Sequence, residues 1–155
     1  MTASAAYFQD TITYDLWATG KSLEATVALP GAKGATARAA LGHLLAAQRI
    51  WLARLQSTDH DNAFFPELSA EELSAYYARN VAAWTAYKDA LTDAEVSRLV
   101  VFKNMKGVEY KRTVQKILTH MVLHSQYHRG QIALRLRMEG GTPIPTDYTY
   151  WTDET

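Results

Sequence analysis

The sequence predicts an all-α protein, a four-helix bundle with a small β-hairpin before the last helix. Four segments of roughly 20–27 residues repeat apolar side chains at three-, four- and seven-residue spacings, the period of one helix face. One short segment between the third and fourth of these has a strand-like pattern instead. A chain of 155 residues has the size of one ordinary domain, so we expect residues 1–155 to form a single bundle.

The first two helices are marked by their ends. Residues 4–29 form the first, and Pro30 with Gly31 stops it. Thr36 is the expected N-cap of the second helix, which runs to about Gln56. The side chains expected to face the core are Phe8, Ile12, Leu16, Leu23 and Val27 in the first helix, and Leu41, Leu44, Leu45, Trp51, Leu52 and Leu55 in the second.

The third helix follows a polar loop over residues 57–68. Ser69 is its expected N-cap, acidic residues complement its positive end, and the helix runs to about Leu91. Its expected inward side chains are Leu73, Tyr76, Tyr77, Val81, Trp84 and Leu91.

The hairpin and the last helix complete the chain. Residues 99–102 and 108–110 are the expected strands, with Gly107 supplying a positive φ in the turn. The last helix starts near Arg112, and the glycines and prolines of residues 140–145 end it in an extended tail. Its expected apolar stripe is Val114, Ile117, Leu118, Met121, Val122, Ile132 and Leu136.

Charge and residue content exclude several function classes. Sixteen Lys and Arg balance sixteen Asp and Glu, so no overall field favours nucleic acid or an anionic membrane. The absence of cysteine excludes disulfides, thiolate metal sites and cysteine nucleophiles. The N-terminal residues lack a basic stretch followed by a continuous apolar run, so we expect a soluble cytoplasmic protein that binds neither nucleic acid nor membranes. The basic residues Lys103, Lys106, Lys111, Arg112 and Lys116 are interpreted as a solvated face of the hairpin.

Two histidines interrupt the apolar face of the last helix. His124 and His128 are four residues apart, which places their Cβ atoms ~5–6 Å apart and allows two imidazoles to bind one metal ion. His120 is eight residues from His128, about 12 Å along the axis, which is too far for the two to share an ion. Of the remaining histidines only His43 is predicted on another long helix, so a third ligand is sought there.

The pattern alone leaves two interpretations of these histidines open. A buried imidazole without a partner costs ~1–3 kcal/mol, so each ring needs either a hydrogen-bond partner or a cation. The spacing of His124 and His128 fits a metal site, but the same spacing also arises by chance in helices with hydrogen-bonded histidines. His60, in the loop, is interpreted as solvated.

At this point the residues resemble the DinB/YfiT-like family. HSQYHRGQI (residues 124–132) is the most specific part, and YDLWA (14–18), HLLAAQRIW (43–51) and the hairpin extend the resemblance over nearly the whole chain. It implies an up-down-down-up four-helix bundle that binds a divalent ion, commonly nickel or zinc. The implied ligands are His43, His124 and His128. A homodimer is a further implication of the resemblance.

Three histidine ligands leave coordination positions for water or substrate, as in a catalytic site. The resemblance implies a metal-dependent hydrolase, or a transferase that uses a low-molecular-weight thiol, acting on a small molecule. Any thiol must come from the substrate, because the chain has no cysteine. The alternatives are a non-catalytic metal-binding or dimerisation module with a structural metal, and a metal-free helical protein with hydrogen-bonded histidines.

Other residues are candidates for contacts around the ligands. His120 is a candidate for orienting a ligand, although a plain structural role is preferred. Tyr127, Arg129 and Gln131 are interpreted as surface-facing or helix-packing residues, with Arg129 as a candidate clamp for an anionic substrate group. The aromatic residues Trp17, Trp51, Tyr76, Tyr77 and Trp84 are expected in the core, with one or two lining a pocket above the metal.

Overall fold

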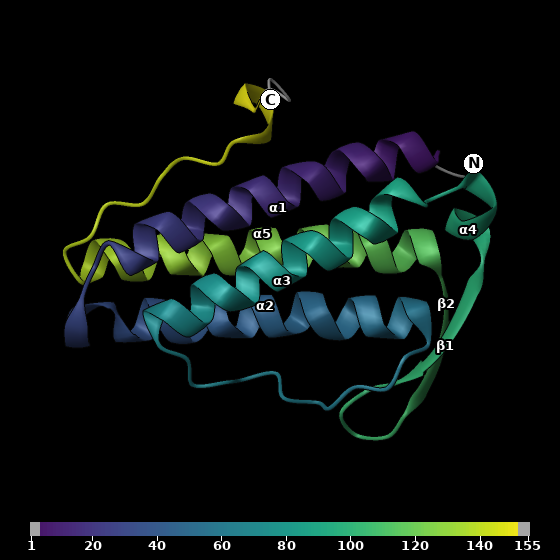
Figure 1. The fold of residues 1–155 in the computed structure, drawn as a ribbon, viewed down its shortest axis with the longest axis horizontal. Coiled ribbons are helices and arrows are strands. Elements are labelled where there is room, and N and C mark those ends of the chain that lie inside the picture. Colours follow the sequence, from purple (N-terminus) through teal and green to yellow (C-terminus); the bar gives the residue numbers. More distant parts are fainter. Residues whose placement is uncertain (1–3, 152–155) are drawn as a thin grey trace.

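Long helices run the length of the molecule in the computed structural model, which describes residues 4–151 (Figure 1). Within these residues there are four of them: α1 (Ala5–Val27), α2 (Ala35–Gln56), α3 (Ala70–Asp89) and α5 (Val114–Met138). α1 and α5 run in one direction, and α2 and α3 in the other (Figure 1). The predicted up-down-down-up bundle is therefore confirmed, and the loop between α2 and α3 returns along the molecule.

The hairpin before α5 is also confirmed. β1 (Leu99–Lys103) and β2 (Glu109–Thr113) pair antiparallel, with Val101 opposite Lys111. Gly107 has a φ of 77°, which supplies the left-handed turn residue that the sequence predicted. The remaining short elements are η1 (Gly31–Gly34), α4 (Asp93–Ser97) and η2 (Tyr148–Tyr150). No periodic pattern predicted α4, because five residues are too few to establish one.

The predicted N-cap is correct for α3 and wrong for α2. Ser69 caps α3 through a capping box, in which its hydroxyl accepts from Glu72 and the Glu72 side chain accepts from the Ser69 amide. The prediction of Thr36 as the N-cap of α2 is wrong, because η1 leads directly into the helix and Gly34 is the N-cap. Thr36 lies in the first turn, where its hydroxyl donates to the Glu139 carboxylate.

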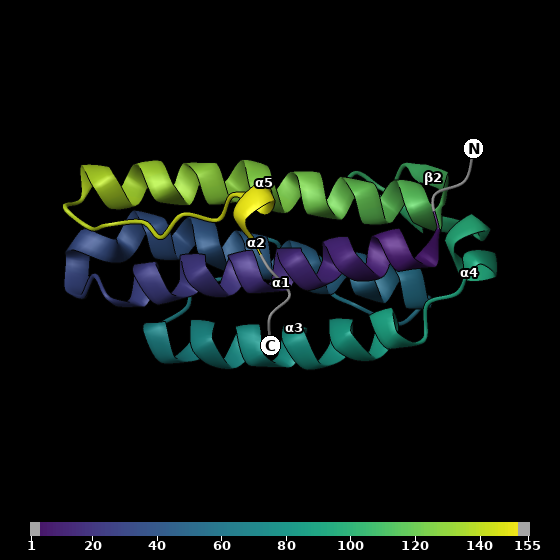
Figure 2. The same cartoon turned by 90° about the horizontal axis from the view of Figure 1, so that it is seen from above.

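α1 and α2 each contact both α3 and α5, so the core lies among all four helices (Figure 2). It consists of two apolar clusters. The first, toward the hairpin, contains Phe8, Ile12, Leu16, Leu52, Leu55, Trp84, Leu91, Val96, Val100, Val114, Ile117, Leu118 and Met121. The second, toward the opposite end, contains Leu23, Ala25, Ala37, Ala40, Leu41, Leu44, Leu45, Leu73, Ile132 and Leu136.

A buried polar layer separates the two apolar clusters. It is made of Asp15, Thr19, Gln48, Asn80, Ser125 and Arg129, which the sequence analysis did not place in the core. The prediction that Val27 faces the core is wrong, because 36% of its surface is exposed at the end of α1. Trp84 is fully buried as predicted, whereas Trp17, Trp51, Tyr76 and Tyr77 are only partly buried.

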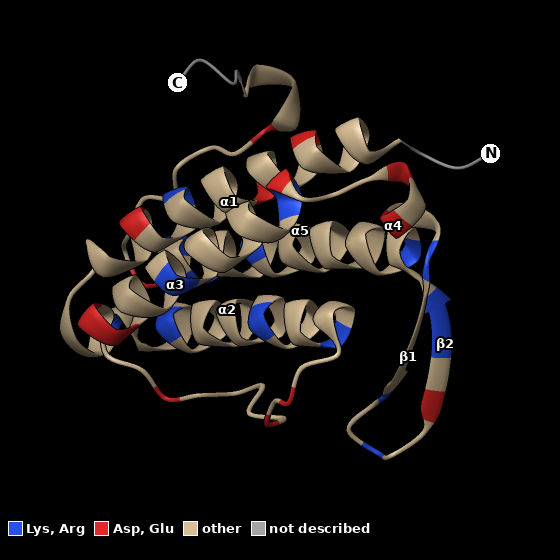
Figure 3. Ribbon diagram, turned by 45° about the vertical axis from the view of Figure 1, so that its right-hand side comes forward, with Lys and Arg blue, Asp and Glu red and all other residues tan. Residues whose placement is uncertain are grey.

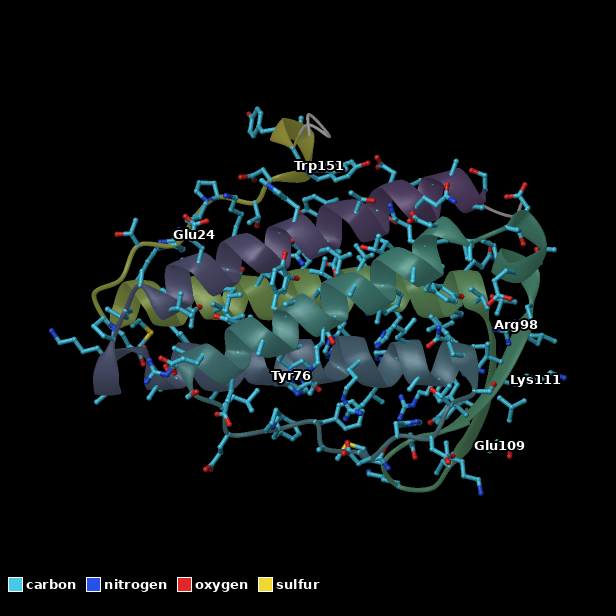
Figure 4. All side chains as sticks on the ribbon, in the orientation of Figure 1. Glu24, Tyr76, Arg98, Glu109, Lys111 and Trp151 are labelled. Atoms are coloured by element: carbon cyan, nitrogen blue, oxygen red, sulfur yellow. The ribbon has the colours of Figure 1, made fainter. Side chains whose placement is uncertain are left out.

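The chain after α5 is an extended tail that returns along α1. The Tyr14 hydroxyl donates to the carbonyl of Thr146, and the Trp151 ring packs edge-on against Tyr14 at 5.7 Å. Trp151 lies near α1 in Figure 4. Among residues 4–151, no helix is both long and apolar enough to span a lipid bilayer.

Candidate metal centre

Three histidines from two helices meet on one side of the bundle. His43 comes from α2, and His124 and His128 come from successive turns of α5. One ring nitrogen from each lies within 4.8 Å of the others. The structure therefore brings together the three residues that the sequence analysis named as ligands. His60 lies outside this group, in the loop, where its Nδ1 is 3.2 Å from the carbonyl of Thr58.

Hydrogen bonds behind two of the rings fix their tautomers. Nδ1 of His43 donates to the carbonyl of Phe64 at 2.7 Å, and Nδ1 of His128 donates to Oε1 of Gln131 at 2.9 Å. A neutral imidazole whose Nδ1 carries the proton keeps a lone pair on Nε2. Both Nε2 atoms are therefore available as acceptors or ligands, the arrangement that outer hydrogen bonds impose on metal-binding histidines.

His124 and His128 meet through the same kind of atom. Their Nε2 atoms are 3.2 Å apart. Two nitrogens bound to one ion at ~2.0–2.1 Å with near-tetrahedral angles lie about 3.3–3.4 Å apart, so this separation fits a shared ion. Without an ion, His124 must instead carry its proton on Nε2 and donate it to His128. The two interpretations thus require different tautomers of His124.

Burial keeps these imidazoles neutral. Burial, followed by the neighbouring rings of His128, His120 and His43, lowers the pKa of His124 to about 4. Burial and the proximity of His43 also lower the pKa of His128, whereas the hydrogen bond that His128 donates to Gln131 raises it. Since a metal ion binds the neutral imidazole, both rings are in the ligating form at neutral pH.

The loop between α2 and α3 supplies contacts that the sequence analysis missed. The Phe65 ring stacks on His43 with a centroid distance of 4.5 Å and an angle of 8°. Phe64 provides the carbonyl that fixes the His43 tautomer. The loop can approach closely because a Cβ at Gly42 would lie only 3.1 Å from the carbonyl oxygen of Pro66. No spacing rule in the sequence predicts the path of this loop.

The residues predicted around the ligands have separate roles. The Tyr127 side chain is exposed, and its ring lies edge-on to His128 at 5.2 Å. The His120 ring lies 5.6 Å from that of His124 and 4.9 Å from that of Trp51.

Arg129 is buried, so the interpretation as a surface residue is wrong and the helix-packing interpretation fits. Only 3% of its surface is exposed, and its guanidinium donates to the carboxylate of Asp15 on α1 and to Gln126. Its Nε has no hydrogen-bond partner among residues 4–151, and its role as a clamp for an anionic substrate group stays a prediction.

The fold and the site define a four-helix-bundle protein with a three-histidine cluster that could bind a metal ion. The model of the DinB family matches residues 19–155, so the chain belongs to the DinB family, as the motifs predicted. Protein DinB of Bacillus subtilis (strain 168) is 50% identical over 54 residues, which are 35% of this chain. Those residues cover only 31% of that relative.

A solved structure supports the fold. The crystal structure of a DinB-like protein from Bacillus cereus ATCC 10987 matches with a TM-score of 0.72 and 21% identity. The match covers 94% of this chain and 99% of that one.

Proposed function

We propose that this protein is a metal-dependent enzyme acting on a small molecule through a divalent ion held by His43, His124 and His128. The observation that carries the proposal is the convergence of three ring nitrogens within 4.8 Å from two helices. Nickel and zinc are the proposed ions, because imidazole nitrogen suits both. Three protein ligands leave room for water or substrate at the ion.

The reaction class follows from what such a centre supplies. A divalent ion bound here would act as a Lewis acid and favour deprotonation of water or of a thiol. We propose that the reaction is hydrolysis, or a transfer that uses a low-molecular-weight thiol. Because the chain has no cysteine, this thiol would have to be part of the substrate.

The chain's own residues orient and expose the ligands. Phe64 and Gln131 hold the rings of His43 and His128 in the ligating tautomer. Partial exposure of the three rings keeps the centre open to a small molecule.

Metal content tests the proposal directly. Untagged protein, purified without added metal, is measured for nickel and zinc alongside His43→Ala, His124→Ala, His128→Ala and His120→Ala. We expect the first three substitutions to remove the metal and His120→Ala to retain it. Equal loss from all four, or retention in all four, contradicts the assignment.

Turnover separates an enzyme from a protein with a structural metal. The metal-loaded protein is assayed against activated esters, amides and thiol–electrophile pairs, and its melting temperature is compared with and without chelator. Turnover that disappears in His124→Ala supports the enzyme. A large loss of melting temperature on chelation, with no turnover of any compound, supports the structural alternative.

We further propose a homodimer formed through α5. Leu123, Tyr127, Leu134 and Met138 lie on one face of this helix and are 58–78% exposed. Light scattering after size exclusion tests the proposal: a dimer is expected, and Leu134→Glu with Met138→Glu is expected to make it monomeric. A monomeric wild-type protein at high concentration contradicts it.

A further inference from the structure

A separate cavity lies beside the histidine cluster, between α2, the hairpin and the first turns of α5. Its volume is about 330 Å³, within the range of small-molecule pockets. Its lining includes three cationic side chains, Arg54, Arg112 and Lys116, and three aromatic ones, Trp51, Phe102 and Tyr110. None of the described residues that line it is acidic. The cavity therefore combines positive charge with flat apolar walls.

Arg54 is the innermost cation of the cavity. Only 6% of its surface is exposed, and its Nε has no hydrogen-bond partner among residues 4–151. One Nη atom donates to the carbonyl of Lys103 at 3.1 Å, and the guanidinium lies 4.6 Å from the Trp51 ring centroid and 5.0 Å from that of Phe102. No carboxylate within the described residues pairs with it. A buried cation without an anionic partner is costly, so Arg54 is poised to receive one.

The other two cations of the lining, Arg112 and Lys116, are exposed to solvent. Tyr110 and Arg112 alternate along β2 and share one face of the strand, whereas Lys111 lies on the other face and extends away from the bundle (Figure 4). Lys111 and Arg112 are the two basic residues of β2, and further basic residues lie along α2 (Figure 3). The basic residues interpreted from the sequence as a solvated face therefore have different positions. Arg112 and Lys116 line the cavity, and Lys111 does not.

The aromatic walls define the shape of a ligand. Phe102 and Tyr110 stack with an interplanar angle of 22°, and Trp51 meets Phe102 edge-on at 5.1 Å. Offset and edge-on contacts of this kind also accommodate an additional flat ring. An anion alone would leave these apolar surfaces uncovered, so the lining favours an organic acid with a flat body.

Two chains of contacts connect the cavity to the histidine cluster. The first runs through His120, whose ring lies between those of Trp51 and His124. The second runs through Phe64, whose ring lies 5.7 Å from the Arg54 guanidinium and whose carbonyl bonds to His43. A ligand held in the cavity would therefore lie beside the candidate metal centre.

We propose that this cavity binds small organic acids with a flat aromatic or unsaturated body, the carboxylate pairing with Arg54, Arg112 and Lys116. The assignment of these acids as the substrate class rests on the proposed enzyme; the binding itself does not. Arg54 supplies the buried anchor, and the two exposed cations draw the carboxylate into the cavity and set the preference for negative charge.

Benzoate and its neutral analogue benzamide test the preference in the chelator-treated full-length protein. Calorimetric titration is expected to show benzoate binding about tenfold more tightly than benzamide. The paired substitution Arg112→Gln with Lys116→Gln, which changes exposed side chains, is expected to remove most of that difference. Lys33→Gln, which removes a positive charge at the opposite end of the bundle, is the matched control and is expected to change nothing. Equal affinity for the two compounds, or an unchanged preference in the paired variant, overturns the inference.

Two further measurements separate this inference from the proposed function. His124→Ala is expected to lose metal and still bind benzoate, while the paired cavity variant is expected to keep metal and lose the benzoate preference. If the wild-type protein binds metal but shows no preference for benzoate, the proposed acid-binding cavity is overturned and the proposed metal site is not. With manganese loaded at the histidines, proton signals of bound benzoate are expected to broaden, and sharp signals with benzoate bound contradict the substrate assignment.

Discussion

Two polar groups of residues lie next to each other on α5 and differ in how their hydrogen bonds are satisfied. Ser125 and Arg129 belong to the buried polar layer, and His124 and His128 each precede one of them by one residue, about 100° around the helix. In the polar layer the Asp15 carboxylate and the side-chain amides find partners within the chain, whereas Nε of Arg129 has none among residues 4–151. In the histidine cluster, ring nitrogens from three side chains converge within 4.8 Å of one another.

The polar layer is closed by contacts across the bundle. The Gln48 amide donates to the Asp15 carboxylate at 3.0 Å and to Thr19 at 3.2 Å, and the Asn80 amide donates to the Leu45 carbonyl at 2.9 Å. Burial raises the pKa of Asp15, while the ion pair with Arg129 opposes that rise. The comparison teaches that the buried polar layer pairs nearly all of its groups across the bundle, whereas the histidine cluster directs ring nitrogens at one another, as the proposed metal site requires.

The largest expected effect comes from breaking the polar layer. Arg129→Met leaves the Asp15 carboxylate buried without its cation, so the free energy of unfolding is expected to fall by about 3–5 kcal/mol. Adding Asp15→Leu removes the stranded charge and is expected to restore most of this loss. Urea unfolding measures both variants. A loss below ~1 kcal/mol in the single variant contradicts the structural role of the ion pair.

Substitutions in the histidine cluster are expected to change how much a bound metal stabilises the protein. A metal at 100 times its dissociation constant adds about 2.7 kcal/mol to the free energy of unfolding. His124→Ala and His128→Ala are expected to lose that gain, whereas His120→Ala and Arg129→Met keep it. Urea unfolding with and without the metal measures the gain for each variant. A metal-dependent gain that survives in His124→Ala is incompatible with its role as a ligand.

A smaller effect is expected behind the ligands. Gln131→Leu removes the acceptor at Nδ1 of His128 and is expected to weaken metal binding by about tenfold. Gln131→Glu keeps an acceptor at that position and is expected to bind at least as tightly as the wild type. Competition with a chromophoric chelator measures the affinities. Equal affinity in all three proteins shows that this hydrogen bond does not orient the ring.

At a pH of about 6 and above, the smallest expected effect concerns protons in the metal-free protein. His124 has a pKa of about 4 in the fold and 6.5 as a free side chain, so between these values the unfolded chain binds more protons than the native one. Stability is therefore expected to fall as the pH drops from about 6.5 toward 4. In chelator, urea unfolding at several pH values should show a shallower decline for His124→Gln than for the wild type. Identical declines contradict the lowered pKa.

The fold could be predicted because its evidence is local. Apolar residues at helical spacing identify each long helix, and Ser69 with Glu72 marks a helix start within four residues of sequence. The start of α2 escaped prediction because Thr36 resembles a cap, whereas the preceding 3-10 turn makes Gly34 the cap. Local propensity does not distinguish these two starts.

Polar residues in the core were harder to predict. Asp15, Gln48 and Asn80 each look like surface residues in their own helix, because their partners come from other helices. His124 and His128 could be found because both lie on one helix at a fixed spacing. The Phe64 carbonyl could not, since a backbone oxygen leaves no mark in the sequence and its position depends on tertiary contacts.

The close approach of the loop at Gly42 has a consequence for protein design. The backbone oxygen that aligns His43 belongs to a segment seated against a helix position without a side chain. Grafting the three histidines onto another bundle would copy their side chains but not the loop between α2 and α3, whose Phe64 carbonyl orients His43. A faithful transplant therefore includes the returning loop and the vacant surface on which it rests.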